Sequence, residues 1–506
     1  CEWFLQSKSG KDLRYSDYYI WSDDIPDDEK EQIRRRYEQP DPSSSTIGRF
    51  VQADAPRAKY YEKNYYESQP ALNYGYAHPD PAHPWEQSVD TPGPRATRQE
   101  LKNIMSFWFD KGSNQMPALP LASDYVRYLG TPDKSAQDIS IELYSLASKW
   151  NMNVGDYLTT ITLRGLGEST PQIYSLVESL IGQAVPDEAI LSGLKADVIR
   201  SRADSKKRQG ACNAALQKYM MYGPELIKTS TLTNAQVMGI SSEELLSSLK
   251  ELYGCQHKIL YYGPATLEEV KTLLAEHSNA SWEPVVKTVP AKVLTRTPKV
   301  FVTPYNSRQF NYMQYSNRGE SLILDQAPYV DLFNEYYGSG MNSIVFQEMR
   351  ESRALAYSAG AQLVRPSFTN DEYYFRATIA SQNDKLVKAV EGFKEIIETL
   401  PEAPENLEIA KSAILNKIRT QRTHGIQVLY QYIRNQELGL SVPREKLVYD
   451  KVGQLTMYDL LATHEEWIKG RTYHYAITGD VKDLDMKFLG TLGPVKVVSS
   501  EEIFGY

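Results

Sequence analysis

The sequence predicts an α+β protein in which two homologous domains, each an antiparallel sheet with helices on one face, follow a loop-rich segment. Three observations predict this. Amphipathic helices alternate with pairs of strands after residue 112. The order of these elements occurs twice before residue 506. Residues 1–112 differ in composition, being crowded with Tyr, Trp, Pro and Asp. Runs of strands followed by runs of helices are typical of α+β layers.

Composition excludes several classes of protein. The length of 506 residues fits roughly three or four domains, and 41% hydrophobic with 24% charged residues is ordinary for a globular protein. A net charge of −8 gives no footprint for nucleic acid, and no run approaches the roughly 20 apolar residues of a membrane span. Three cysteines, Cys1, Cys212 and Cys255, are too few for a disulfide framework. Because the sequence begins at Cys1 without Met or a signal peptide, we interpret it as processed or as a fragment.

The first 112 residues show little helical periodicity before Arg98. Stretches such as "KNYYESQPALNYGYAHPDPAHPWEQ" are aromatic and polar. Aromatic rings stack on sugar faces and amide groups bond hydroxyls, so this composition is typical of a carbohydrate cleft. A surface excursion held together by aromatic packing explains it equally well. In "TRQELKNIMSFWFDKG" a Thr cap, apolar residues at helical spacing and a Gly stop predict a helix over residues 98–110.

After residue 112, apolar periodicity predicts the elements of the first domain. Its helices are expected at 117–129, 135–150, 170–183, 187–207, 211–221, 242–251 and 266–276, and its strands near 151–166 and 257–262. The second domain is predicted to contain a strand pair over 299–317, helices at 327–337 and 341–353, strands at 356–365 and 371–380, helices at 384–400 and 404–423, and a final strand at 472–478. Residues 305–317 either form an ordinary strand, line a chamber or receive a peptide as an added strand.

An internal repeat relates the two domains. The matching pairs of segments are 125–148 with 332–355, 170–204 with 383–421, and 257–274 with 472–489. We therefore expect three parts, 1–112, 113–296 and 297–506, with a joint between two unrelated fragments near residues 112–116.

Residues 1–112 resemble a fragment of the α-amylase superfamily, glycoside hydrolase family 13. The similar stretches are "CEWFLQSKSGKDLRYSDYYIW", "QPALNYGYAHP" and "TRQELKNIMSFWFDKG". The resemblance implies a B domain next to part of a barrel, and carbohydrate contacts at Gln69 and Asn73. Ala71 stands where the family has Asp, and Gly112 is followed by "SNQM" rather than by the nucleophile strand. The catalytic carboxylates of a retaining glycosidase are therefore missing, and the barrel cannot close.

Residues from about 114 to 506 resemble the C-terminal, non-catalytic half of the insulinase/pitrilysin-type zinc metallopeptidases. The sharpest match is "VFQEMRESRALAYSAG" at 345–360, where the spacing of Arg350 and Tyr357 follows the family, although Ala356 replaces the usual Gly. The resemblance implies that Arg350 and Tyr357 contact the substrate or the transition state, in an assembled enzyme alone. A structural interpretation also stays open, because Arg350 suits a helix C-terminus and Tyr357 suits a strand.

Neither zinc-binding spacing, H-x-x-E-H or H-E-x-x-H, occurs among the seven histidines. The stretch "HEEW" at 464–467 lacks a second histidine at helical spacing, so we interpret His464 as part of a solvated helix cap. We expect no metal or other cofactor on this chain. The resemblance places zinc on an N-terminal peptidase half that this sequence does not contain.

These observations predict a peptide-binding half of a peptidase that docks on a zinc-bearing half or subunit, with no nucleic-acid partner and no membrane span. Two alternatives stay open, a glycoside hydrolase of the α-amylase or α-glucosidase type and an inactive structural paralogue that acts as a scaffold. The family resemblance points to the bacterial cell envelope, in particular the periplasm. The native substrate and the origin of the joint are not encoded in any motif of the sequence.

Overall fold

The structure is a computed structural model, and it describes residues 102–506 except 278–282, 357, 422 and 424. All described residues belong to one compact unit. The predicted carbohydrate contacts, Gln69 and Asn73, lie outside the described residues, as does the remainder of residues 1–101.

The first sheet is antiparallel throughout, with strand order β2-β3-β1-β4. Its strands are β1 (Lys102–Phe109), β2 (Lys149–Val154), β3 (Thr159–Leu166) and β4 (His257–Tyr262). The predicted strands near 151–166 and at 257–262 are thus confirmed. The predicted helix over 98–110 is wrong where the structure describes it, because residues 102–109 form β1.

Burial explains why β1 is a strand. Met105, Phe107 and Phe109 alternate along it and are buried against the helices of the first domain. Trp108 and Ile104 point to the opposite face, where they pack against a helix from the second domain. A strand that is apolar on both faces also places apolar residues at helical spacing, so its periodicity was ambiguous. Residues 102–109 therefore complete the first sheet, although their sequence resembles the α-amylase-type fragment assigned to residues 1–112.

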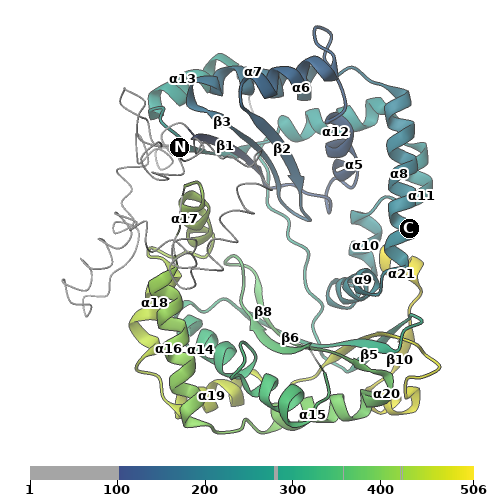
Figure 1. Cartoon of the computed structure of the whole chain (residues 1–506), viewed down its shortest axis with the longest axis vertical. Helices are drawn as coiled ribbons and strands as arrows, with labels where there is room; N and C mark the ends of the chain where they lie inside the picture. The colour runs from purple at the N-terminus through teal and green to yellow at the C-terminus, as the bar shows by residue number, and fades with distance from the viewer. Residues whose placement is uncertain (1–101, 278–282, 357, 422, 424) are drawn as a thin grey trace, which may run out of the picture. The chain divides into compact units, whose positions relative to one another are not determined.

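The helices of the first domain match the predicted order, with several confirmed to within a few residues. They are α5 (Leu119–Val126), α6 (Ala136–Ser145), α7 (Thr170–Gln183), α8 (Glu188–Lys206), α9 (Gln209–Tyr222), α10 (Pro224–Ser230), α11 (Asn234–Gly239), α12 (Ser242–Tyr253) and α13 (Leu267–His277), with a 3₁₀ turn at Gly167–Ser169. Capping boxes begin α6 at Ser135, α11 at Thr233 and α12 at Ser241. Figure 1 shows α7 and α13 on the same side of the sheet.

The second sheet has the order β10-β5-β9-β6-β8-β7. Its strands are β5 (Lys299–Pro304), β6 (Gln309–Ser321), β7 (Ser358–Val364), β8 (Glu372–Gln382), β9 (His474–Gly479) and β10 (Val495–Val497). The pairs among β9, β6, β8 and β7 are antiparallel, as predicted, while β5 runs parallel to both β9 and β10. Because β6 is hydrogen-bonded on both sides, it has no free edge to receive a peptide.

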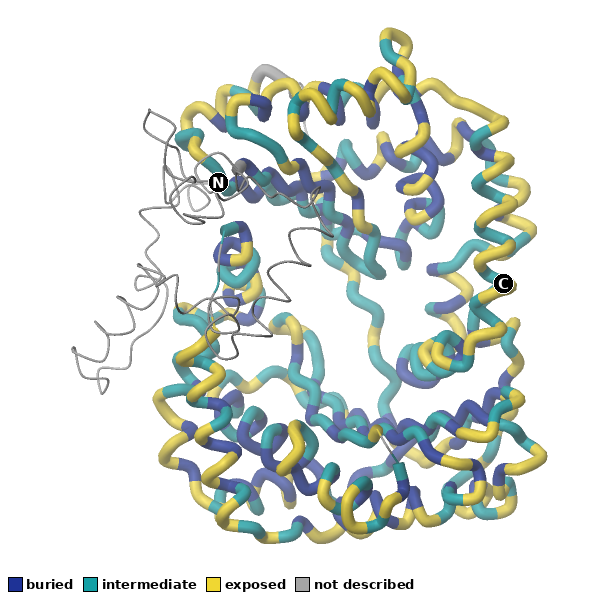
Figure 2. The backbone as a smooth tube through the Cα atoms, in the orientation of Figure 1, coloured by how far each residue is buried: buried dark blue, intermediate teal, exposed yellow. Residues whose placement is uncertain are grey.

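Helices cover one face of the second sheet and bury a large apolar core (Figures 1 and 2). They are α14 (Ala327–Tyr337), α15 (Leu386–Glu398), α16 (Pro404–Thr420), α18 (Arg444–Val452), α19 (Met457–Trp467) and α20 (Met486–Leu492). Two further helices of this domain, α17 (Gln427–Glu437) and α21 (Ser500–Phe504), pack in other clusters. Short 3₁₀ turns lie at Leu324–Gln326 and Asn383–Lys385. The helix predicted over 341–353 is a π-helix, η5 (Phe346–Ser352).

The strand orders confirm the internal repeat. Written from its other edge, the second sheet reads β7-β8-β6-β9, which corresponds strand for strand to β2-β3-β1-β4. The strand β1 is therefore the counterpart of β6, and β4 the counterpart of β9. The second sheet continues beyond β9 with β5 and β10, whereas among the described strands the first sheet ends at β4.

Each domain contributes one helix that packs on the other domain's sheet, on the face which that domain's own core helices leave uncovered. Leu216 and Met220 of α9 pack in one apolar cluster with Met313 and Ala476 of the second sheet. In return, α17 packs its apolar side on Leu260 and Trp108 of the first sheet. This exchange buries the two repeats against each other and makes them one folding unit. Within the described chain, no helix has the length and apolar character needed to cross a membrane.

Candidate functional site

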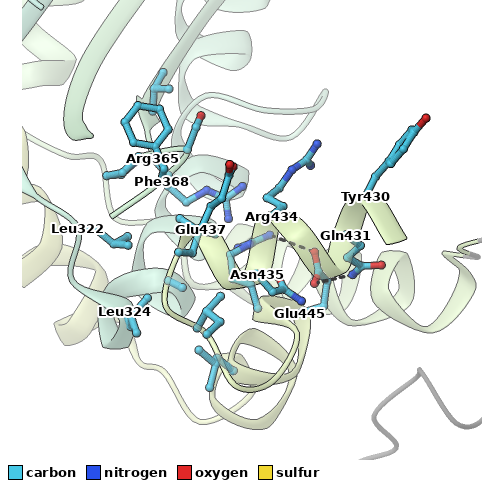
Figure 3. A pocket seen from close by; sticks show the side chains of 18 of the residues that line it. Leu322, Leu324, Arg365, Phe368, Tyr430, Gln431, Arg434, Asn435, Glu437 and Glu445 are labelled. Atoms are coloured by element: carbon cyan, nitrogen blue, oxygen red, sulfur yellow. Dashed lines mark hydrogen bonds and ion pairs between the residues drawn. The ribbon is translucent and has the colours of Figure 1, made fainter. Parts of the chain in front are cut away.

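A cavity of about 730 Å³ lies between the two repeats (Figure 3). Its walls come from the outer face of β1, the β2–β3 turn, the linker near Lys287, the segments around 322–324 and 364–368, and helices α17 and α18. A cavity of this size, between two domains, suits a few residues of a peptide. Its wall combines apolar and charged side chains.

Aromatic rings line much of the wall. The rings of Trp108 and Tyr430 lie 5.0 Å apart between centroids, and those of Tyr157 and Phe368 meet edge to face at 6.0 Å. Such pairs prefer tilted or edge-to-face packing because the ring face is negative and its rim positive. They provide rigid apolar surface at which a ligand side chain can pack.

A group of ion pairs closes one side of the cavity. The Lys287 ammonium donates to Glu437 Oε1 at 2.7 Å and lies over the ring of Phe368, 5.0 Å from its centroid. Lys258 donates to Asp110 at 2.9 Å and lies 3.9 Å from the same Glu437 oxygen. The carboxylate of Glu437 is thereby shared by two lysines, which ties α17 to the linker and to the first sheet.

A second group of charges lies at the start of α18. Asp331 accepts from Arg365 at 2.6 Å and from Arg444 at 2.5 Å. Burial raises the pKa of Asp331 to about 6, and the charge of Arg444 opposes that rise. Gln431 donates to Glu445 Oε2 at 3.2 Å beside them, as Figure 3 shows. These contacts fix the side chains in this part of the wall. Because the charged groups are already paired with one another, they are poorly available to bind a ligand.

Arg434 of α17 differs from the other charged groups of the wall. Among the described residues its guanidinium has no ion-pair or hydrogen-bond partner, and Figure 3 shows the side chain extended from the helix between Glu437 and Tyr430. Burial raises the pKa of the nearby Tyr157, and Arg434 opposes that rise. A guanidinium with unoccupied donors next to aromatic rings suits a carboxylate or a peptide carbonyl.

Arg350, one of the predicted pair Arg350 and Tyr357, does not line this cavity. Arg350 lies on the π-helix η5, with its Cζ 4.6 Å from the centroid of the Phe346 ring and its Nε 3.2 Å from Glu351. Tyr357 lies outside the described residues. Their joint substrate role therefore stays a prediction. A π-helix is rare, and such turns frequently occur at functional sites.

The interpretation of His464 as a solvated cap is wrong. Its side chain is 3% exposed, and its ring packs near those of Phe333 and Tyr337. Burial lowers the pKa of His464, and the same cause lowers the pKa of His257 and of His474. In the part of the chain that the structure describes, no group of three or more His, Cys, Asp or Glu side chains could hold a metal ion.

Comparison with known proteins relates most of the described chain to M16-type peptidases. Residues 240–414 match the peptidase M16 inactive domain. The peptidase M16 inactive domain from Pseudomonas fluorescens has a similar structure, with a TM-score of 0.61 at 15% identity over 76% of this chain and 94% of that one. The periplasmic protease PqqL from Escherichia coli gives 0.59 at 14% identity over 76% of this chain. The ferredoxin protease FusC, in complex with Arabidopsis ferredoxin, gives 0.59 at 12% identity over 75% of this chain.

The chain spans 43% of PqqL and 42% of FusC, so it corresponds in fold to part of those longer chains. The resemblance of residues 114–506 to the non-catalytic half of insulinase-type peptidases is confirmed. An oligo-1,6-glucosidase from Heyndrickxia coagulans is 28% identical over 110 residues, which are 22% of this chain and 15% of the glucosidase. This match agrees with the predicted amylase-type fragment.

Sequence reasoning missed the cavity because it missed α17. The available signal was the spacing of Ile426, Leu429 and Ile433, all of which are buried. That spacing predicts a short amphipathic helix. It does not reveal that the helix packs on the sheet of the other domain, because the partner residues are more than 150 positions away along the chain.

Proposed function

We propose that this chain is the peptide-binding, non-catalytic half of an insulinase-type peptidase. The match of residues 240–414 to the inactive domain carries the proposal. It is supported by a peptide-sized cavity between the repeats, with aromatic walls and the guanidinium of Arg434. Bond cleavage is assigned to a zinc-bearing half or subunit, because the sequence has no histidine motif that could bind zinc and activate water.

In this proposal the cavity holds one segment of the peptide. The rings of Trp108, Tyr157 and Phe368 pack on its apolar side chains, and Arg434 pairs with a carboxylate. Arg350 and Tyr357 contact the substrate in the assembled enzyme alone. An Arg fork binds a carbonyl or carboxylate, and a Tyr hydroxyl can donate to an oxyanion. Because PqqL is a periplasmic protease, we also place this chain in the cell envelope.

The test is a binding titration with fluorescent decapeptides that are identical except for two Glu or two Gln residues. We expect Arg434→Gln to weaken binding of the acidic peptide about tenfold and to leave the Gln peptide unchanged, since a charged hydrogen bond contributes about 1.5 kcal/mol or more. Arg200→Gln is the matched control, because Arg200 is an exposed arginine of α8 paired with Asp197. Equal binding of both peptides by the Arg434 variant and the unaltered chain would contradict the assignment of the cavity.

A mixing experiment separates the peptidase half from the alternatives. Adding a recombinant zinc-bearing N-terminal half of an M16 peptidase should restore peptide cleavage, and Arg350→Ala or Tyr357→Phe should then lower turnover. A scaffold would bind the partner without restoring cleavage. Release of reducing ends from malto-oligosaccharide by the chain alone would instead support the glycosidase alternative.

A further inference from the structure

The outer edge of β4 presents unpaired backbone groups. The N–H of Gln256 donates to Glu283 O at 2.7 Å, and the N–H of Glu283 donates to Gly254 O at 3.0 Å. The backbone groups of residues 254 and 256 therefore point away from β1. Within β4 itself the direction is set by the sheet. Gly155 N–H donates to Leu158 O at 2.8 Å, and the unbroken registers of β2, β3, β1 and β4 then direct the main-chain groups of Leu260 toward β1 and those of Ile259 and Tyr261 outward. Among the described residues, Ile259 and Tyr261 have no main-chain partner on that side.

The second repeat shows what fits such an edge. There the counterpart strand β9 pairs with β6 on one side and with β5 on the other, in parallel, from Lys299 opposite His474 to Pro304 opposite Gly479. Val300 and Val302 of β5 are fully buried by this pairing. In the first repeat, the linker makes a single parallel bridge at Cys255 and then leaves the edge, because Lys287 bonds Glu437 on α17.

The repeat also identifies the segment of this chain that corresponds to β5. Tyr262 and Thr478 each precede the glycine that ends their strand, and they pair with Ile104 and Asn311. Aligning Ile104 with Asn311 makes residues 92–97, "PGPRAT", the counterpart of "KVFVTP" in β5. Its two prolines lack the N–H that a ladder requires, and it has no β-branched apolar residue to bury. A peptide that resembles β5 would therefore offer the edge more main-chain donors than this sequence does.

We propose that the outer edge of β4 is a second peptide site, which binds an extended segment parallel to β4. Main-chain hydrogen bonds to Ile259 and Tyr261 supply the pairing, as in other strand additions. The two faces beside this edge are apolar, with Leu260 and Trp108 on one side and Ile259 and Tyr261 on the other. The ligand is therefore a segment without proline before its last residue and with β-branched apolar residues at alternate positions, like β5. The inference rests on the proposed function in one respect, that the ligand is a peptide.

The probe is a synthetic peptide with the β5 sequence "KVFVTP" extended by one Thr at its N-terminus. Hydrogen exchange followed by mass spectrometry should show slower exchange in the fragment 256–263 when the peptide is added, and no change around residues 300–304. Two N-methylated forms supply the control within the ligand. Methylation of the alternate N–H groups that face β4 should weaken binding at least tenfold, and methylation of the others should not.

Four outcomes decide the proposal. Slower exchange at 256–263 that depends on one N-methyl set supports it. The proposal is overturned if hydrogen exchange at 256–263 does not slow, or if both sets of N-methyl groups weaken peptide binding equally. Slowing that appears on raising the protein concentration without peptide assigns the edge to a second copy and overturns the peptide assignment. Arg434→Gln leaves the β4 edge intact. Slower exchange at 256–263, together with binding of the acidic peptide that is equal in this variant and in the unaltered chain, would therefore reject the cavity and retain the edge site.

Discussion

Ala147 and Ala354 occupy equivalent positions of the two repeats, and both have a left-handed backbone, with φ of 48° and 47°. Each follows the helical segment that precedes the edge strand of its sheet, β2 in one domain and β7 in the other. Among the described residues no other non-glycine residue has a positive φ. Both domains therefore turn into the edge strand by the same backbone conformation, although the side chain there disfavours it.

Replacing these alanines by glycine should stabilise the fold. A Cβ in the left-handed region costs about 1–2 kcal/mol, part of which is offset because glycine loses more entropy on folding. We expect Ala147→Gly and Ala354→Gly each to raise the free energy of unfolding by up to about 1 kcal/mol in urea titrations. Ala196→Gly, at an exposed position inside α8, is the control and should lower it by about 1 kcal/mol. A similar loss in all three variants would show that the turns gain nothing from glycine.

Helix α17 should be held mainly by its apolar contacts with the first sheet. Leu429 is 6% exposed and packs in the cluster with Leu260. Leu429→Ala should lower the free energy of unfolding by about 2–5 kcal/mol. It should also speed hydrogen exchange across α17 more than across α16, since the helix loses its contact with the other domain. Gln436→Ala, at an exposed position of α17, serves as the control. Unchanged exchange in α17 would argue against the exchange of helices between domains.

The buried histidines should make the fold sensitive to acid. Burial lowers the pKa of His464 below its usual 6.5, so the unfolded chain binds more protons than the folded chain once the pH falls below about 6.5. Stability should therefore be constant near pH 7.5 and fall as the pH drops through 6.5 toward the folded pKa, by at most about 1.4 kcal/mol per pH unit for one histidine.

Thermal unfolding at pH 7.5, 6.5 and 5.5 measures this dependence. His464→Phe keeps an aromatic ring beside Phe333 and Tyr337 but removes the titrating group. The slope between pH 6.5 and 5.5 should shrink in the variant, while the contributions of His257 and His474 persist with the same sign. An identical slope in the variant and the unaltered chain would show that His464 does not titrate in this range.

The purified chain should hold no stoichiometric zinc. The sequence lacks both inverted and standard His-Glu zinc spacings, and the described residues include no cluster of three metal-binding side chains. Metal analysis after gel filtration is expected to find well under one zinc per chain, and a chelator should leave the unfolding temperature unchanged. One tightly held zinc per chain would refute the assignment of the metal to a separate half.

The spacing of apolar residues along the sequence was sufficient to predict most of the helices and strands. The predicted helices at 170–183 and 327–337 agree with α7 and α14, because the apolar residues of each recur at helical spacing; α7 also has an exposed side, whereas α14 is buried or half-buried throughout. The repeat was also visible in the sequence, since equivalent helices and strands face equivalent cores. The proposed division at residues 112 and 296 stays a prediction, as do the roles of Arg350 and Tyr357.

The sequence by itself thus determined the α+β class, the repeat, the absence of a zinc motif and the two family resemblances. Only the tertiary structure decided that residues 102–109 form a strand, that α9 and α17 pack on the opposite sheets, and that among the described strands β4 lacks the outer partner that β9 has. The physical reason is that periodicity reports how many faces of a segment are buried. Which distant segment buries them depends on contacts between residues far apart in the chain, and a single sequence does not pair those residues.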